Sequence, residues 1–167
     1  MGRNAGYLSL VATALVALVA STVEKLPRLV WNAGASVPRG AYWIAGHNFA
    51  IGSIVAVRLP ADVASLAHAR GYLDQRAILL KTVRAAEGSR VCRTGPIVSV
   101  DRRVAALARS HDGAGRPLTS WRGCVTLGAG DIFLLSRMPG SFDGRYFGVL
   151  RRDAVVGQAI PLWTWTR

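Results

Sequence analysis

The sequence predicts a mainly β domain with one short helix, preceded by an N-terminal transmembrane helix. Three observations support this prediction. Short runs of β-branched and aromatic residues, bounded by Gly, Pro or Asp, recur along most of the chain. A single segment shows apolar residues at helical spacing. The first 25 residues are largely apolar, as expected of a segment that crosses a bilayer.

The length and composition of the chain indicate one domain with an N-terminal appendage. The chain has 167 residues, of which 51% are hydrophobic, and this is enough for a single core. We therefore expect a membrane anchor over residues 1–25 and a single domain over residues 26–167.

The N-terminal segment from Ala5 to Val23 has only Ser and Thr as polar side chains. A helix of about 17–25 apolar residues spans a bilayer, so the segment is long enough. A signal peptide is the alternative, with Arg3 as its charged start and Ala20 as its cleavage position. Leu18 argues against this alternative, because a small residue is expected there.

The strands are predicted from the β-branched and aromatic runs. One helix interrupts them, with Asp62 as its cap, Val63, Leu66 and Ala67 on one face, and Gly71 at its end. The predicted strands are Ala41–Ile44, Ile54–Leu59, Ile78–Val83, Arg90–Cys92, Ile97–Val100, Cys124–Leu127, Ile132–Leu135, Tyr146–Leu150 and Val155–Leu162.

Two glycine-containing segments are predicted to lie outside the regular elements. Residues 33–40, which are mostly small, are expected to form a tight turn, and residues 110–117 an exposed loop. Trp163 and Trp165 near the end of the chain either contact a membrane interface or pack in the core, and the sequence leaves both alternatives open.

The formal net charge of +12 suggests an anionic partner. The arginines are spread along the whole chain, and no nucleic-acid-binding motif accompanies them. We therefore expect acidic membrane lipid as a partner and no specific nucleic acid.

The two cysteines, Cys92 and Cys124, form an even pair outside the apolar N-terminal segment. Such a pair can form a disulfide in an oxidising compartment, and two separate buried thiols are the alternative. The three histidines, His47, His68 and His111, are scattered, and no metal-ligand spacing is present. We expect neither a metal site nor a cofactor.

Lys81 is one of only two lysines among 21 basic residues, and it lies in the apolar run Ile78–Val83. Burial lowers the pKa of a lysine from its usual value of about 10.4, whereas arginine stays protonated. A neutral amine can take the proton of a hydroxyl nucleophile. Lys81 is therefore a candidate general base.

Ser36, in the predicted turn, is the candidate hydroxyl, although a serine in such a turn usually serves the turn alone. Exposed backbone N–H groups of the turn, including that of Ser36, could stabilise an oxyanion. Further along, Ser141 and Asp143 are two residues apart and face the same side in an extended chain. Asp143 and Arg145 also read as an ordinary structural ion pair.

In this order, these segments resemble the type I signal peptidases, which use a Ser/Lys dyad, and more closely their conjugative-transfer, TraF-type branch. The resemblance implies a signal-peptidase-like β domain with Ser36 as nucleophile and Lys81 as general base. It also implies that Ser141 orients the lysine and that Asp143 and Arg145 hold its loop. The resemblance rests on residues 32–42, 79–83, 128–133, 141–148 and 161–164.

Two departures from the family pattern point toward the conjugative branch. Bacterial signal peptidases often carry a Ser two residues before the nucleophile, where this chain has Gly34. The oxyanion hole would then depend on backbone N–H groups, including that of Ser36. The chain is also too short for the large extra β domain of some signal peptidases.

The implied function is that of a membrane-anchored serine endopeptidase that cleaves or cyclises the conjugative pilin precursor. The expected place is the inner membrane, crossed once, with the catalytic domain in the periplasm. A general signal peptidase that removes leader peptides from other exported proteins is one alternative. A non-catalytic, basic, membrane-tethered module of a secretion assembly is the other.

Overall fold

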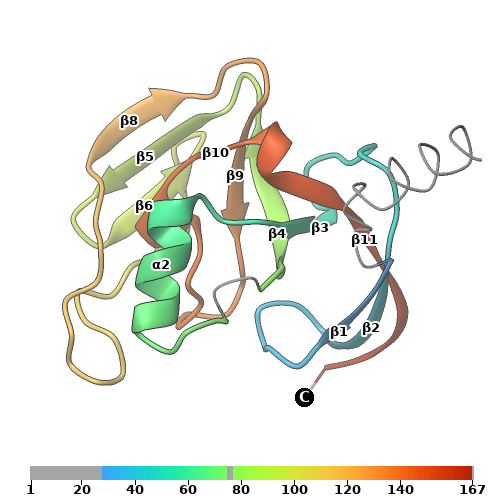
Figure 1. Cartoon of the computed structure of the whole chain (residues 1–167). Helices are drawn as coiled ribbons and strands as arrows, with labels where there is room; N and C mark the ends of the chain where they lie inside the picture. The colour runs from blue at the N-terminus through green and yellow to red at the C-terminus, as the bar shows by residue number, and fades with distance from the viewer. Residues whose placement is uncertain (1–27, 75–76, 167) are drawn as a thin grey trace, which may run out of the picture.

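In a computed structural model of the protein, which describes residues 28–74 and 77–166, the chain forms two antiparallel sheets (Figure 1). The larger sheet has seven strands in the order β1-β2-β11-β3-β4-β9-β10. Their bounds are β1 Leu29–Asn32, β2 Arg39–Ile44, β3 Ile54–Val57, β4 Leu79–Ala86, β9 Asp131–Leu135, β10 Leu150–Arg151 and β11 Val155–Trp165.

The smaller sheet has four strands in the order β7-β6-β5-β8 and lies at the upper left of Figure 1. Its strands are β5 Arg90–Thr94, β6 Ile97–Val100, β7 Arg103–Leu107 and β8 Gly123–Thr126. The helical elements are α2 Ala61–Ala69, the short α3 Gly144–Phe147 and the 3-10 turn η1 Arg152–Ala154.

The long strand β11 lies between β2 and β3 and so joins the β1–β2 hairpin to the rest of the larger sheet. Its first part pairs with β3 and its last part with β2, with register shifts between Val155 and Gly157 and between Pro161 and Trp163. A Cβ on Gly157 would lie only 2.1 Å from the carbonyl oxygen of Ala45, so this crossing needs glycine. The arrangement brings the C-terminal strand beside the hairpin of β1 and β2.

Three apolar clusters form the core. Strand β4 contributes to all of them, through Leu79 and Val83, through Ala85, and through Leu80. Strand β4 pairs with β3 and β9 along its two edges, and the consecutive residues Leu79, Leu80 and Lys81 are all buried, so both faces of the strand are covered there. A lysine on this strand is therefore placed in an apolar environment.

The mainly β architecture with one short helix is confirmed, and the turn before β2 and the loop at residues 110–117 are found where they were predicted. The strand predicted over Tyr146–Leu150 is wrong. There, the Asp143 carboxylate accepts a hydrogen bond from the Arg145 N–H and starts α3. Gly148, with a φ of 77°, ends this helix before β10.

The predicted cap of the longer helix is also wrong. Helix α2 begins at Ala61 with Pro60 in the cap position, and no side chain caps it. Asp62 lies in the first turn instead, where a negative charge favours the helix dipole. Gly71, with a φ of 69°, follows the helix as predicted.

The strands β1 and β7 were not predicted from the sequence. Both are the end strands of their sheets and are short. Strand β7 follows a turn in which Asp101 and Arg102 both have positive φ, at 50° and 67°. Hairpin turns of this kind usually show Gly or Asn, and neither is present here.

The predicted anchor over residues 1–25 lies outside the described residues. Within residues 28–74 and 77–166, no helix has both the length and the apolar character needed to cross a membrane.

Candidate active site

Ser36 lies in the turn that connects β1 to β2. The side chain of Asn32 organises this turn from within: its amide donates to the carbonyls of Gly34, Val37 and Pro38 at 2.9, 3.1 and 3.0 Å. Its oxygen accepts from the N–H of Gly34 at 3.2 Å. One side chain therefore holds the backbone on both sides of Ser36.

Lys81 extends from the centre of β4 and is only 4% exposed. Its cross-strand partner on β3 is Val55, which is fully buried. Burial lowers the pKa of Lys81 from 10.5 to about 8, while the charge of Asp143 acts to raise it and that of Arg145 to lower it. A substantial fraction of the amine is therefore neutral near neutral pH.

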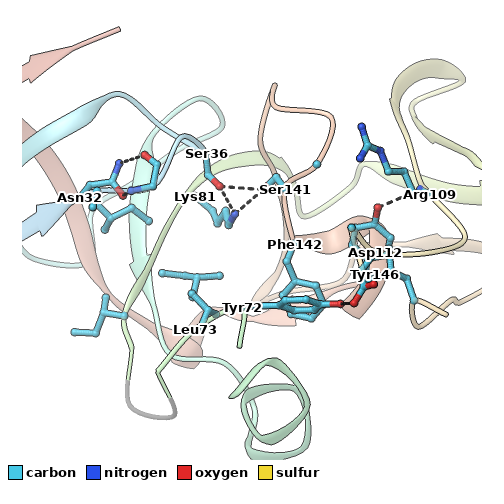
Figure 2. Close-up of a pocket in the computed structure, with 18 of the residues that line it drawn as sticks. Asn32, Ser36, Tyr72, Leu73, Lys81, Arg109, Asp112, Ser141, Phe142 and Tyr146 are labelled. Carbon is cyan, nitrogen blue, oxygen red and sulfur yellow. Dashed lines mark hydrogen bonds between the residues drawn. The ribbon is translucent and has the colours of Figure 1, made fainter. Parts of the chain in front are cut away.

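The structure brings Ser36, Lys81 and Ser141 into mutual contact (Figure 2). The Nζ of Lys81 lies 2.7 Å from the Oγ of Ser36 and 2.6 Å from the Oγ of Ser141. The two hydroxyl oxygens are 3.0 Å apart. These three residues come from the β1–β2 turn, from β4 and from the segment before α3, so only the tertiary fold unites them.

The geometry suits proton transfer from a hydroxyl to an amine. A neutral lysine has two N–H donors and one lone pair. If it donates to Ser141, its lone pair is free to accept the hydroxyl proton of Ser36, which makes that oxygen a stronger nucleophile.

Asp143 and Arg145 are fully and almost fully buried, with exposed fractions of 0% and 2%. Arg145 Nε lies 2.9 Å from Asp143 Oδ1, and Nη2 lies 3.0 Å from Oδ2. The guanidinium also donates to the carbonyls of Ser136 and Pro139, at 2.6 and 2.9 Å. The pair therefore holds the segment between β9 and Ser141.

Ser136 was not identified from the sequence. Its Oγ donates to the carbonyl of Ser36 at 2.6 Å, and its N–H donates to Asp143 Oδ2 at 2.9 Å. It connects the Ser36 turn directly to the buried ion pair. The only signal in the sequence was a polar residue at the end of the apolar run Ile132–Leu135.

Arg93 on β5 connects the smaller sheet to this network. It is buried, and its guanidinium donates to the carbonyl of Arg145. Its neighbour Cys92 is bonded to Cys124 on β8, its partner in the strand register, with an S–S distance of 2.06 Å. The predicted disulfide is thus present in the structure.

Ser36 lines two cavities. The first, of about 530 Å³, is lined by Lys81, Ser141 and residues of the loop after β7. The second, of about 1090 Å³, is lined by Ser136, Met138 and Trp165. Ser36 lines both, so an extended chain that filled the two cavities would pass its side chain.

The N–H of Ser36 donates to no other group in the described part of the chain. It is thus available to an incoming oxygen atom, as the oxyanion prediction requires. Within the same residues, no group of three or more His, Cys, Asp or Glu side chains could hold a metal ion.

Several known proteins are similar to this chain. A plasmid transfer protein TraF from Escherichia coli is 30% identical over 99% of this chain and 93% of its own length. A second TraF from the same species is 31% identical over 80% of this chain and 82% of its own length. A probable conjugal transfer protein TraF from Sinorhizobium fredii is 35% identical over 70% of this chain and 65% of its own length.

A solved signal peptidase I from Enterococcus faecalis aligns with 68% of this chain and 98% of its own, at 16% identity and a TM-score of 0.39.

The family profile described as "Signal peptidase, peptidase S26" matches residues 3–165, which is nearly the whole chain. Together with relatives at 30% identity or more over most of the sequence, this match shows that the chain belongs to the signal peptidase family S26.

Proposed function

We propose that the protein is a membrane-anchored serine endopeptidase with a Ser/Lys dyad, in which Ser36 is the nucleophile and Lys81 the general base. The observation that carries this proposal is the buried Lys81 amine, 2.7 Å from the Ser36 hydroxyl and 2.6 Å from that of Ser141. Membership of a peptidase family supports the same kind of reaction.

The proposed reaction is acyl transfer in two steps. Ser36 Oγ attacks the carbonyl carbon of the scissile peptide bond while Lys81 Nζ accepts its proton. Backbone N–H groups, including that of Ser36, stabilise the resulting oxyanion. The C–N bond then breaks as Lys81 returns the proton to the leaving amine, and an ester of Ser36 remains.

The ester can be resolved in two ways. Attack by water releases a linear product with a new carboxylate. Attack by an amino group of the same substrate forms a new peptide bond and releases a cyclic product. In both cases Lys81 takes a proton from the incoming group, and Ser36 Oγ recovers one as the ester bond breaks.

We propose that the substrate is the pilin precursor of a conjugative transfer system. The relatives named for plasmid or conjugal transfer, and the resemblance to TraF-type peptidases, support this assignment over a general signal peptidase. Gly34 also stands where many general signal peptidases carry a serine.

The proposal is tested by co-expressing the full chain with the pilin precursor from the same locus and measuring the intact mass of the pilin. We expect the wild-type chain to shorten the pilin precursor and the Ser36→Ala variant to leave it unprocessed. A cyclic product would be lighter than the linear one by one water. If the Ser36→Ala form processes the pilin equally well, the protein is not the peptidase, and the non-catalytic alternative gains support.

We further propose that the chain is held in the inner membrane, with the domain in the periplasm and against the lipid surface. The apolar N-terminal segment supports an anchor. An exposed row of large apolar side chains also begins directly where the described chain begins, and a disulfide fits an oxidising compartment.

This row occupies one face of β1, β2 and β11, which we call the tryptophan face. The strand register places Leu29 beside Trp43 and Trp43 beside Ile160. At the next position along the same face, Ala41 pairs with Trp31 on one side and with Trp163 on the other. The six large apolar side chains are between 36% and 65% exposed: Leu29, Trp31, Trp43, Ile160, Trp163 and Trp165.

The tryptophan face has the chemistry of a bilayer interface contact. Indole rings favour the headgroup region, and Trp31 and Trp163 lie with ring centres 6.1 Å apart. Arg28 precedes the face, and Arg39 pairs with Trp165 in the strand register, so that cations border it. An anionic bilayer matches both the apolar surface and these charges.

We expect lipid-borne bromine quenchers in anionic vesicles to reduce the tryptophan fluorescence of the full chain. Replacing Trp163 and Trp165 by Ser should remove much of the quenching, whereas Trp121→Phe should leave it intact. Trp121 is a suitable control because it is half-buried against Phe133, away from this face. Equal quenching in both variants would contradict the contact.

A further inference from the structure

We propose that the substrate segment that occupies the cavity beside Lys81 carries a carboxylate, and that the Arg109 guanidinium binds it. This inference rests on the proposed peptidase function and adds a specificity determinant. It follows from the charge balance of the cavity, from the free guanidinium of Arg109 and from the rigidity of the wall that carries it.

The cavity of about 530 Å³ has an apolar part and a charged part. Leu73, Ile78, Leu79 and Leu118 contribute to the apolar part. The charged part is formed by the segment after β7, with Arg109, His111 and Asp112. In Figure 2, Arg109 and Asp112 lie on the opposite side of Phe142 from Lys81.

Among the described residues that line the cavity, Asp112 is the only carboxylate, and it is already fully engaged. Its Oδ2 accepts from the Tyr72 hydroxyl at 2.5 Å and from Arg116 Nε at 2.7 Å. Its Oδ1 accepts from the N–H groups of Ala114 and Arg116, both at 2.9 Å. Asp112 therefore has no free position with which to bind Arg109 or a cation of the substrate.

Arg109 has no such partner. Among the described residues, its guanidinium makes no hydrogen bond or ion pair. Only the backbone N–H of Arg109 is engaged, and it donates to the Tyr146 hydroxyl at 3.1 Å. With Asp112 neutralised by Arg116, Arg109 gives this end of the cavity a net positive charge. A guanidinium binds a carboxylate through two parallel hydrogen bonds, which makes it selective for that group.

The wall that carries Arg109 is rigid. Arg70, directly after α2, donates to the carbonyl of Pro117 at 2.7 Å, and Arg116 donates back to the carbonyl of Arg70 at 3.0 Å. On the other side, the Tyr146 ring stacks on Phe142, with 5.9 Å between centres and 7° between planes. A binding group on a preformed wall loses little conformational freedom when the ligand arrives.

The carboxylate can come from an Asp or Glu side chain near the scissile bond or from the C-terminus of the precursor. The co-expression assay distinguishes these sources. Each acidic residue within about ten positions of the cleavage site is replaced by Lys in turn. Residues within this span can reach the cavity, because an extended chain advances about 3.3 Å per residue. In a separate precursor, a Gly-Ser-Gly tail displaces the C-terminal carboxylate.

We expect Arg109→Glu to slow pilin processing about tenfold or more, because the change removes a charged hydrogen bond to the carboxylate and also places a like charge beside it. Arg90→Glu is the matched control, because it makes the same change in charge at an exposed residue that lines neither cavity beside Ser36. For an acidic side chain, one Lys replacement in the precursor should impair processing by the wild type and restore it with Arg109→Glu. For the C-terminus, the tail alone should impair processing.

Three results would decide against the inference. If the wild-type chain does not process the precursor, the proposed function is wrong, and the inference that rests on it is wrong as well. If processing occurs and Arg109→Glu matches Arg90→Glu, the proposed function stands and Arg109 is not the determinant. If neither a Lys replacement nor the tail affects processing, no carboxylate is recognised.

Discussion

Lys81→Arg is expected to lower the rate of precursor processing by about 10⁴-fold or more, which is the effect of removing a member of a catalytic triad. Arginine keeps a positive charge at this position but cannot release its proton near neutral pH. The Ser36 hydroxyl would then lose its proton acceptor at 2.7 Å. The measurement is the rate at which processed pilin appears in membranes that contain the variant.

Two observations accompany this prediction. The wild-type rate should rise about tenfold per pH unit below pH 8 and level off above it, because only the unprotonated Lys81 amine, with a pKa of about 8, accepts a proton. The thermal unfolding of Lys81→Arg should show a folded protein. A folded Lys81→Arg variant with substantial activity would exclude Lys81 as the general base.

Arg145→Ala is expected to destabilise the protein by about 3–5 kcal/mol, because it leaves the Asp143 carboxylate buried without its counter-ion. Asp143 is 0% exposed, so its carboxylate has no solvent contact that compensates for the lost guanidinium. The carbonyls of Ser136 and Pro139 lose a donor as well. For a domain of this size the change corresponds to a drop in melting temperature of roughly 6–20 °C, measurable by circular dichroism.

Arg151→Ala is the matched control. Arg151 Nη1 lies 2.7 Å from Asp131 Oδ1, a distance similar to that in the buried pair, but the Arg151 side chain is 63% exposed. An exposed ion pair contributes about 0–1 kcal/mol, so this variant should melt close to the wild type. Equal losses in both variants would show that the buried pair does not stabilise the domain through its charges.

The central part of the fold could be predicted from the sequence because its strands are continuous apolar runs. Ile78–Val83 and Ile132–Leu135 became β4 and β9, which pair with each other inside the larger sheet. The edge strands β1 and β7 escaped prediction because apolar residues occupy their exposed positions as well as their half-buried ones, so the sequence shows no alternation of polar and apolar residues. The α3 turn escaped because its capping by Asp143 depends on a buried side chain.

The residues of the candidate site also differed in whether the sequence alone could identify them. Lys81 could be identified from composition, as a lysine in an apolar strand, and Ser36 from the turn and the family resemblance. Ser136 could not, since its partner Ser36 is 100 residues away in the sequence. Asn32 acts within its own turn, but its hydrogen bonds depend on a rotamer that the sequence does not specify.

Ser36 lines two cavities, and this bears on how the proposed acyl-enzyme partitions. In the proposed first step, the two substrate segments joined by the scissile bond would each occupy one of these cavities. When the leaving segment dissociates, its cavity is vacated while the other still holds the ester. Hydrolysis follows if water fills the vacated space first. Ring closure follows if the substrate's own amino terminus, supplied at a high effective concentration by its tether, arrives sooner.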